Sequence, residues 1–503
     1  MSNFNIFYDG SIVGLYIIVT MALGLYVRKY VGKVEHFLVA GREVNVYLGI
    51  ASLAATEFGI VTCMYAAQNG YKYGFAGATP GILYGVAMLF VGLTGFVVKP
   101  LRESGVITIP ELIERSFGEK VRVASGIVIV LGGLLNMGVF LRVGGEFLLT
   151  VSGAGTPESY FLIGGFELPV LETMMTAMLL LVAVYTIFGG MLSVLVTDFL
   201  QFVVMSVGLL LVTGIIFYTI GWDQLVTTVD TVHGAGGFNP FVHEKMGLAY
   251  IVFNAMVALA AILTWQANIA RVLASKDADT GRKIYTRTSF FFICRILIPT
   301  IWGIAALYLI GSNLGEKESL QAMPRMLAVI LPVGVMGILI AAMLAADMST
   351  NSSYMLTWAS VIYNDILAPF RRGRKWDERK GLFINRTLVG LIGIFLLFYG
   401  LWYPIKGDLW TYLALTGTIY LASMSVILIA TCYWKKANNW GAIGSIAVSA
   451  AFPVAYLVIE QLPETKYMAE AIGPHYSGIL AYVGSAVAMI VGSLIKPVGG
   501  NNG

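Results

Sequence analysis

Long apolar runs separated by short polar loops cover almost the whole chain. A run of about 20 apolar residues is long enough to cross a bilayer as a helix. The pattern predicts an all-α integral membrane protein with about thirteen such helices and no soluble domain. The predicted spans are 11–27, 45–68, 75–98, 122–150, 170–188, 190–221, 246–272, 286–312, 332–365, 382–402, 408–433, 440–460 and 476–495.

The span 332–365 carries a polar block in its middle, from Leu344 to Tyr354. Its hydroxyl and carboxylate members are Asp347, Ser349, Thr350, Ser352 and Ser353. On a helix Ser349, Thr350 and Ser353 share one face with Ala346, and Ser352 lies beside it. Such hydroxyls can bond to carbonyls one turn back or join helices. Together with an intramembrane acid they favour a site for a small cation.

Composition and charge agree with a membrane protein. Of the 503 residues, 58% are hydrophobic and 12% charged, against about 25% charged in soluble domains. About 23 basic residues, Arg271 among them, fall in loops on one side of the predicted spans and about 6 on the other. This bias predicts a cell (inner) membrane protein with its N-terminus outside and its C-terminus in the cytoplasm. The net charge of +4 then reflects topology and not a nucleic-acid partner.

Catalytic signatures are missing from the sequence. Cys63, Cys294 and Cys432 lie inside spans without metal-ligand spacing, and no HExxH, Gly-x-Ser-x-Gly or phosphate-binding glycine loop occurs. We therefore expect neither an enzyme nor a cofactor.

Two spans look broken near their middle. Glu57 and Gly59 interrupt the second span, and the segment 263–268 interrupts the seventh, five helices later. Transporters are often built from inverted repeats whose lead helices are broken in this way. We expect one five-helix repeat over 45–221 and a second over 246–433. The segments 1–44 and 440–495 would be additions, and 496–503 a disordered tail. The loop 108–118 predicts a short amphipathic helix with Pro110 at its start.

Charged residues inside spans need a partner. A carboxylate such as Asp198 must be compensated by a cation or by arginine. Arg142 and Arg295 are the basic residues placed deep in spans, and each could pair with an acid (Asp198, Glu57, Glu146 or Asp347) or receive a substrate carboxylate. The substrate candidates are Thr62, Asn136, Arg142, Trp265, Gln266 and Arg295.

Five motifs follow one another along the chain: the segment 110–118, Gly189-Gly190 with 197–201, the segment 271–276, the segment 346–350 and the segment 363–366. In this order they resemble the sodium:solute symporter family, which includes bacterial proline, galactose and sialic acid symporters and the human sodium/glucose transporters. The resemblance covers about residues 5–440. It implies the LeuT-type five-plus-five fold with additional helices, and cotransport of a solute with sodium.

The resemblance also implies two ion sites. The main sodium site would use the carbonyls of Ala55, Phe58 and Ala346 and the hydroxyls of Ser349 and Thr350. A second site would use Asp198, Ser352 and Ser353, with Ser349 shared. Glu57 stands where the proline symporter has an acid important for sodium. We name Glu57, Asp198 and Asp347 as ion-coupling acids.

Departures from the family bear on the solute. Asn136 and Arg295 match substrate-contacting positions of the galactose transporter, but Gly81 and Leu413 replace its sugar-binding acid and glutamine. Asp347 stands where an aliphatic residue is more usual. These differences disfavour a sugar, and the arginines favour a small carboxylate-bearing solute such as an amino acid or organic acid.

Three alternatives stay open at this stage. A proton-coupled symporter of the same fold would titrate one of the buried acids. A transporter-like membrane sensor would need a signalling domain, and a channel would need pore loops, and neither is seen in the sequence. No oligomeric state is predicted.

Overall fold

The structure is a computed structural model that describes residues 2–163, 165–367, 369–371, 376–403 and 408–495. The predicted disordered tail 496–503 and the centre of the basic loop 371–380 lie outside the described residues.

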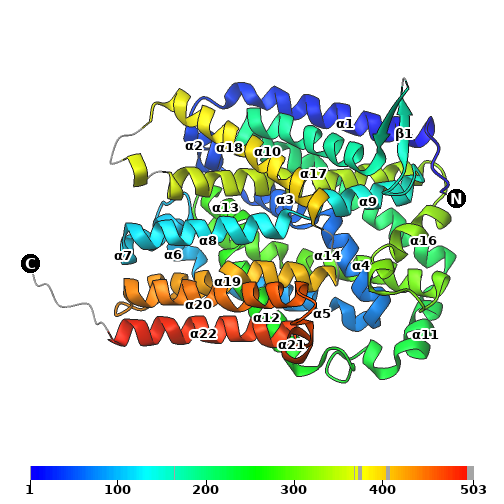
Figure 1. Ribbon diagram of the computed structural model, residues 1–503. Coiled ribbons are helices and arrows are strands. Elements are labelled where there is room, and N and C mark those ends of the chain that lie inside the picture. The colour runs from blue at the N-terminus through cyan, green and yellow to red at the C-terminus, as the bar shows by residue number, and fades with distance from the viewer. Residues whose placement is uncertain (1, 164, 368, 372–375, 404–407, 496–503) are drawn as a thin grey trace, which may run out of the picture.

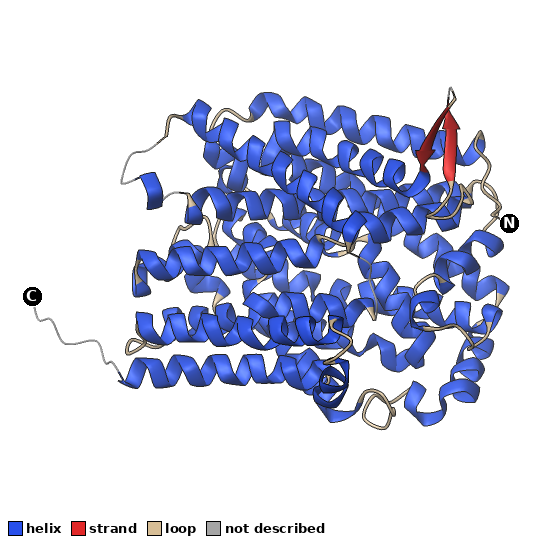
Figure 2. Cartoon of the chain, in the orientation of Figure 1, coloured by secondary structure: helices blue, strands red, loops and turns tan. Residues whose placement is uncertain are grey.

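Most of the described chain is helical, and the long helices run side by side along one direction (Figures 1 and 2). The α-helices are α1 Tyr8–Val27, α2 Val34–Val39, α3 Val46–Glu57, α4 Ile60–Tyr73, α5 Thr79–Thr94, α6 Val98–Glu103, α7 Ile109–Phe117, α8 Glu119–Met137, α9 Phe140–Ser152, α10 Val170–Thr219, α11 Trp222–His233, α12 Gly247–Thr264, α13 Gln266–Ala274, α14 Ala278–Ile310, α15 Glu316–Ser319, α16 Ala322–Ile330, α17 Val335–Val361, α18 Glu378–Trp402, α19 Leu409–Tyr433, α20 Asn439–Gln461, α21 Lys466–Ile472 and α22 Pro474–Ile495. Short turns of other helix types are η1 Arg28–Tyr30, η2 Ala40–Arg42, η3 Gly74–Ala78, η4 Gly234–Gly237, η5 Ile362–Ile366 and η6 Pro369–Arg371.

Among the described residues, 11 helical segments are long and apolar enough to cross a membrane. The segment Ile60–Thr94 joins the end of the predicted span 45–68 to most of 75–98, and Val170–Thr219 covers almost all of the predicted spans 170–188 and 190–221. In the second, α10 is kinked at Gly190, whose φ of 55° is in the region that favours glycine. A Cβ there would also come within 2.5 Å of the Phe37 ring. The predicted multi-pass helical architecture is confirmed.

The predicted breaks are present. Between α3 and α4, Phe58 and Gly59 are extended, and between α12 and α13 Trp265 is extended. One further break was not predicted: the span 122–150 is divided into α8 and α9 at residues 138–139. The repeat boundaries 45–221 and 246–433 stay a prediction.

The ends of the bundle carry the smaller elements (Figure 1). An antiparallel hairpin of β1 (Tyr160–Ile163) and β2 (Phe166–Pro169) lies at the end where α1 begins, with Tyr160 opposite Pro169. Its strands are an addition that the all-α prediction did not include. The predicted helix α7 forms with Pro110 in its first turn and lies at the opposite end, where α22 finishes.

The centre of the bundle is α17, whose residues from Leu339 to Val361 are all buried. It packs against α10, α1, α3 and α8. The carboxylate of Asp9 in α1 accepts hydrogen bonds from the backbone N–H groups of Gly334 (2.7 Å) and Gly337 (2.8 Å). The first helix therefore caps the N-terminal end of α17, because these N–H groups have no partner within a helix.

Candidate functional site

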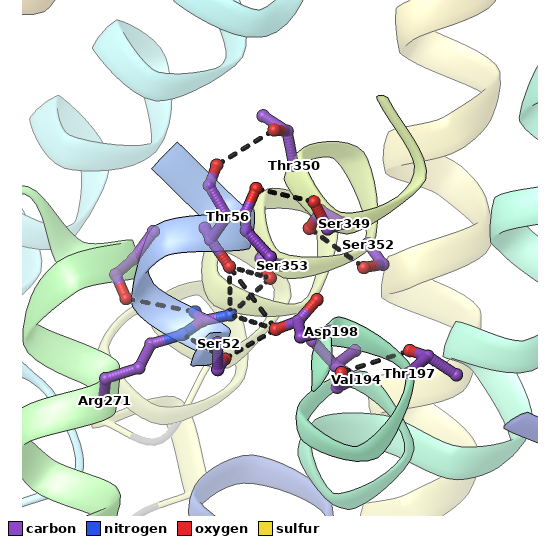
Figure 3. A network of polar contacts seen from close by, with 12 residues as sticks. Ser52, Thr56, Val194, Thr197, Asp198, Arg271, Ser349, Thr350, Ser352 and Ser353 are labelled. Carbon is purple, nitrogen blue, oxygen red and sulfur yellow. Dashed lines mark hydrogen bonds and ion pairs between the residues drawn. The ribbon is translucent and has the colours of Figure 1, made fainter. Parts of the chain in front are cut away.

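The break between α3 and α4 lies directly against the polar block of α17 (Figure 3). The Ser349 hydroxyl donates to the Ala55 carbonyl at 2.7 Å and lies 3.1 Å from the Ala346 carbonyl. The Thr350 hydroxyl donates to the Thr56 carbonyl at 2.9 Å. Because a helix end leaves carbonyls without intrahelical partners, the break supplies oxygen atoms that α17 alone could not.

The residues of the predicted main sodium site therefore gather at one place. Phe58 is fully buried in the break itself, and a Cβ on the next residue, Gly59, would come within 2.9 Å of the Thr350 hydroxyl. Carbonyl and hydroxyl oxygens are ligands that hard cations prefer. Binding of sodium by these oxygens stays a prediction.

A second polar network joins α10, α3, α13 and α17 (Figure 3). Arg271 and Asp198, both 0% exposed, form an ion pair at 3.2 Å. The same Arg271 nitrogen donates to Thr56 Oγ1 at 2.6 Å and to the hydroxyl of Ser353. Ser52 donates to the Asp198 carboxylate at 2.5 Å and accepts from Arg271 Nε at 3.1 Å. A buried charge of each sign is thereby paired and hydrogen-bonded.

This network corrects two predictions. Arg271, counted as a cytoplasmic loop residue, lies in α13 and is completely buried. It is also the partner of Asp198, a role that was considered for Arg142 and Arg295. The signal in the sequence was its position soon after the break at Trp265, from which α13 continues to Ala274. The Arg271 side chain donates back to the Ala267 carbonyl at 3.1 Å.

The predicted second sodium site shares this network. The guanidinium of Arg271 lies between Asp198 and Ser353, and the Ser352 hydroxyl donates to the Ser349 carbonyl at 3.1 Å. The other oxygen of Asp198, Oδ1, has no hydrogen-bond partner within the described part of the chain and points away from Arg271 (Figure 3). A second sodium ion would have to bind on that side, close to the positive charge of Arg271.

A cavity with about 80 Å³ of free space lies beside the break. Four of the predicted substrate residues line it: Thr62, Asn136, Trp265 and Arg295. Tyr65, Tyr84, Phe140, Tyr354 and Trp410 add aromatic walls. Polar atoms that have no hydrogen-bond partner among the described residues also belong to the lining: Trp265 Nε1, Arg295 Nε and the side-chain amide of Asn268.

The charged members of the described lining are Glu57 and Arg295. They form an ion pair of 2.7 Å, with exposed fractions of 7% and 5%. Arg295 Nη1 also donates to the Glu57 carbonyl, so the arginine holds the end of α3 as well as its acid. This is one of the pairings that the sequence left open. Asn268, which the sequence analysis did not select, is a further lining residue.

Arg142 and Gln266 do not line this cavity, contrary to their choice as substrate candidates. Arg142 pairs with Glu146 at 2.9 Å in α9 and faces a separate, outer pocket. Gln266 accepts a long hydrogen bond of 3.5 Å from the backbone of Ile109 in α7. Asn136 lies in α8 and Arg142 in α9, on either side of the break at residues 138–139.

The structure also shows the surroundings of Leu413, Gly81 and Asp347, the three positions at which the sequence departs from the family. Leu413 lines the cavity, and its carbonyl accepts from the Asn136 amide at 2.8 Å, so Asn136 joins α8 to α19. A Cβ on Gly81 would come within 2.6 Å of Ile296, which shows that Gly81 serves close helix packing. Asp347 is buried outside the cavity lining, and its Oδ2 has no hydrogen-bond partner among the described residues.

Broken helices that expose carbonyls to buried hydroxyls, next to a central cavity, are typical of secondary transporters. Residues 37–448 match the sodium:solute symporter family, so the chain belongs to that family. Membership supports sodium-coupled symport of a solute, with sodium and a solute as transported partners, and a transporter rather than an enzyme.

Similar proteins and solved structures agree with this family assignment. The osmoregulated proline transporter OpuE of Bacillus subtilis is 24% identical, over 96% of this chain and 94% of the relative. The sodium/glucose cotransporter of Vibrio parahaemolyticus is 26% identical, over 89% of this chain and 84% of the relative. A substrate-bound, outward-open Na⁺-coupled sialic acid symporter superimposes with a TM-score of 0.77 at 18% identity, covering 97% of this chain and 98% of that one. MhsT in complex with L-phenylalanine gives a TM-score of 0.54 at 13% identity, covering 90% and 98%. Because these structures have the LeuT fold, the predicted fold is confirmed.

Proposed function

We propose that this protein moves a small carboxylate-bearing solute across the cell membrane together with sodium, by alternating access. The observation that carries the proposal is the meeting of the α3 break with Ser349 and Thr350 of α17. Sodium bound between these two elements would join α3 to α17 and hold the cavity wall beside it in place. Arg295 in that wall is the group that would receive the carboxylate.

Sodium and solute must then help each other to bind. An ion that favours the solute-binding state binds more tightly when the solute is present, because coupling between two sites is reciprocal. The membrane potential adds about 2.3 kcal/mol per charge for each 100 mV. Release inside follows from the low sodium concentration there.

The main test uses sodium-dependent thermal stabilisation of the purified protein, with choline as the control ion. Ser349→Ala removes a hydroxyl that would contact the ion, and a hydrogen bond or ligand contact to a charge is worth about 1.5–3 kcal/mol. We expect the half-saturating sodium concentration to rise by about tenfold or more. The matched control is Ser360→Ala in the same helix, whose hydroxyl donates to the Thr357 carbonyl. Equal sodium dependence in both variants would contradict the proposal.

We also propose two sodium ions per cycle, with the second on the free side of Asp198 near Ser352 and Ser353, and Ser349 shared. The sialic acid symporter of similar fold has a novel Na⁺ site in its outward-open state, which supports the search for a further ion in this protein. The expected sodium-to-solute flux ratio in proteoliposomes is near two. A ratio near one would remove the second site from the proposal.

The proposed topology places the N-terminus outside the cell and the C-terminus in the cytoplasm. The start of α1 and the end of α22 lie at opposite ends of the bundle, in support of an odd number of crossings (Figure 1). In a background without the native cysteines, Lys276→Cys between α13 and α14 should react with an impermeant thiol reagent only after the membrane is opened. Reaction in intact cells would reverse the orientation.

A further inference from the structure

The charged wall of the central cavity is already neutral before a solute arrives. Glu57 and Arg295 are the charged residues of the described lining, and their side chains are 2.7 Å apart and almost fully buried. A solute that carries only a carboxylate would bring a second negative charge next to Glu57. In a poorly solvated cavity this repulsion is strong, because the effective dielectric constant is low.

Arg295 keeps donors for a carboxylate in spite of this pair. Its Nη1 is used by the Glu57 side chain and carbonyl, whereas its Nε has no hydrogen-bond partner in the described chain. The guanidinium lies over the ring of Phe292, with 4.1 Å from Cζ to the ring centroid, and 5.3 Å from that of Tyr84. These rings fix the plane of the guanidinium, which favours a directed contact with a planar carboxylate.

Glu57 in turn keeps room for a cation. Its Oε2 accepts from Arg295, but among the described residues its Oε1 receives only a long hydrogen bond of 3.5 Å from the Tyr354 hydroxyl. Tyr354 packs edge to face on Trp265 at 5.4 Å between ring centroids, and Tyr65 packs on Trp410 at 4.9 Å in the wall of the same cavity. Aromatic faces attract cations, so a positively charged nitrogen near Glu57 would meet a second favourable surface.

We infer that the solute is a small zwitterion, such as an amino acid or its N-methylated relative. Its carboxylate contacts Arg295, and its cationic nitrogen contacts Glu57 and the aromatic walls. The pair of opposite charges in the wall then meets a pair of opposite charges in the solute, and no net charge is added to the cavity. This inference rests on the proposed function and narrows its solute class.

The test compares zwitterions with anions of similar shape. Alanine, proline and glycine betaine are matched with propionate, cyclopentanecarboxylate and 3,3-dimethylbutanoate, and neutral galactose is an unmatched comparison. Binding to the purified full-length protein is measured calorimetrically at saturating sodium. We expect at least one zwitterion to bind at least tenfold more tightly than its matched anion. Primary or secondary amines and the quaternary amine of betaine are separate arms, which identify the kind of cationic nitrogen.

Failure of this inference is distinct from failure of the proposed function. Three results would overturn the inference that the solute is a zwitterion. They are anions that bind as tightly as the zwitterions, binding of galactose alone, and a protein that sodium still stabilises but that binds no zwitterion. Absence of any sodium stabilisation would overturn the proposed symport itself.

A pair of variants tests the role of Glu57 directly. Glu57→Gln leaves Arg295 unpaired, so the preference for zwitterion over matched anion should fall at least tenfold. This ratio is insensitive to a general loss of active protein, because both ligands see the same sample. The matched control is Glu146→Gln, whose acid pairs with Arg142 outside the cavity, and it should keep the ratio within about twofold. An unchanged ratio in Glu57→Gln would overturn the assignment.

Discussion

The ion pair between Arg271 and Asp198 gives a sharp prediction about stability. Arg271→Gln removes a guanidinium that is 0% exposed and that binds the carboxylate of Asp198 at 3.2 Å. The shorter, neutral glutamine leaves that carboxylate without its counter-ion. The hydroxyls of Thr56 and Ser353 lose a charged donor at the same time.

The size of the effect follows from burial. Removing one partner of a fully buried pair costs about 3–5 kcal/mol, because the other charge is left uncompensated. Arg142→Gln is the matched comparison: the same substitution breaks an arginine pair of 2.9 Å whose side chains are 24% and 21% exposed. Pairs with access to solvent contribute about 0.2–1 kcal/mol. The two variants should therefore differ by at least about 2 kcal/mol.

Chemical unfolding in detergent micelles, followed by tryptophan fluorescence, measures both variants on one scale. The double variant Asp198→Asn with Arg271→Gln removes both charges and should recover part of the loss, because neither charge is then buried alone. A loss in Arg271→Gln no larger than that in Arg142→Gln would refute the buried ion pair.

Two further predictions concern helix packing and pH. Gly303→Ala should strongly destabilise the protein, because its Cβ would lie 1.9 Å from the Ala67 carbonyl oxygen. Gly214→Ala has open space at its Cβ and should be neutral or stabilising by up to about 1 kcal/mol. The yield of monodisperse protein and its melting temperature measure both effects, and equal behaviour of the two variants would count against the close packing of α4 and α14. Burial lowers the pKa of His233 and of His243 below the ordinary value near 6.5. At a pH between the folded and unfolded pKa values the unfolded chain binds more protons than the folded protein, so the contribution of the two histidines to stability is full above about pH 6.5 and falls on acidification. Replacing both histidines with Gln should flatten the dependence of the melting temperature on pH between pH 7.5 and 5.5. An unchanged dependence would show that other groups govern it.

The sequence by itself determined the membrane-spanning helices and the positions of two breaks. Apolar length and helical periodicity are local properties, so the spans and the shared face of Ser349 and Thr350 could be read directly. The breaks at Phe58 and Trp265 were visible because polar residues and glycine interrupt otherwise apolar runs. The association of the break with α17 followed from resemblance to a family and not from local pattern.

Only the tertiary structure decided which buried charges meet. The sequence left Arg295 with four possible acids and placed Arg271 in a loop, whereas the fold pairs Arg295 with Glu57 and buries Arg271 beside Asp198. It also places Arg142 in α9, where it pairs with Glu146 at a pocket separate from the central cavity. Periodicity fixes which residues share a face of one helix, but the partner across that face depends on the rotation and packing of helices far apart in the chain.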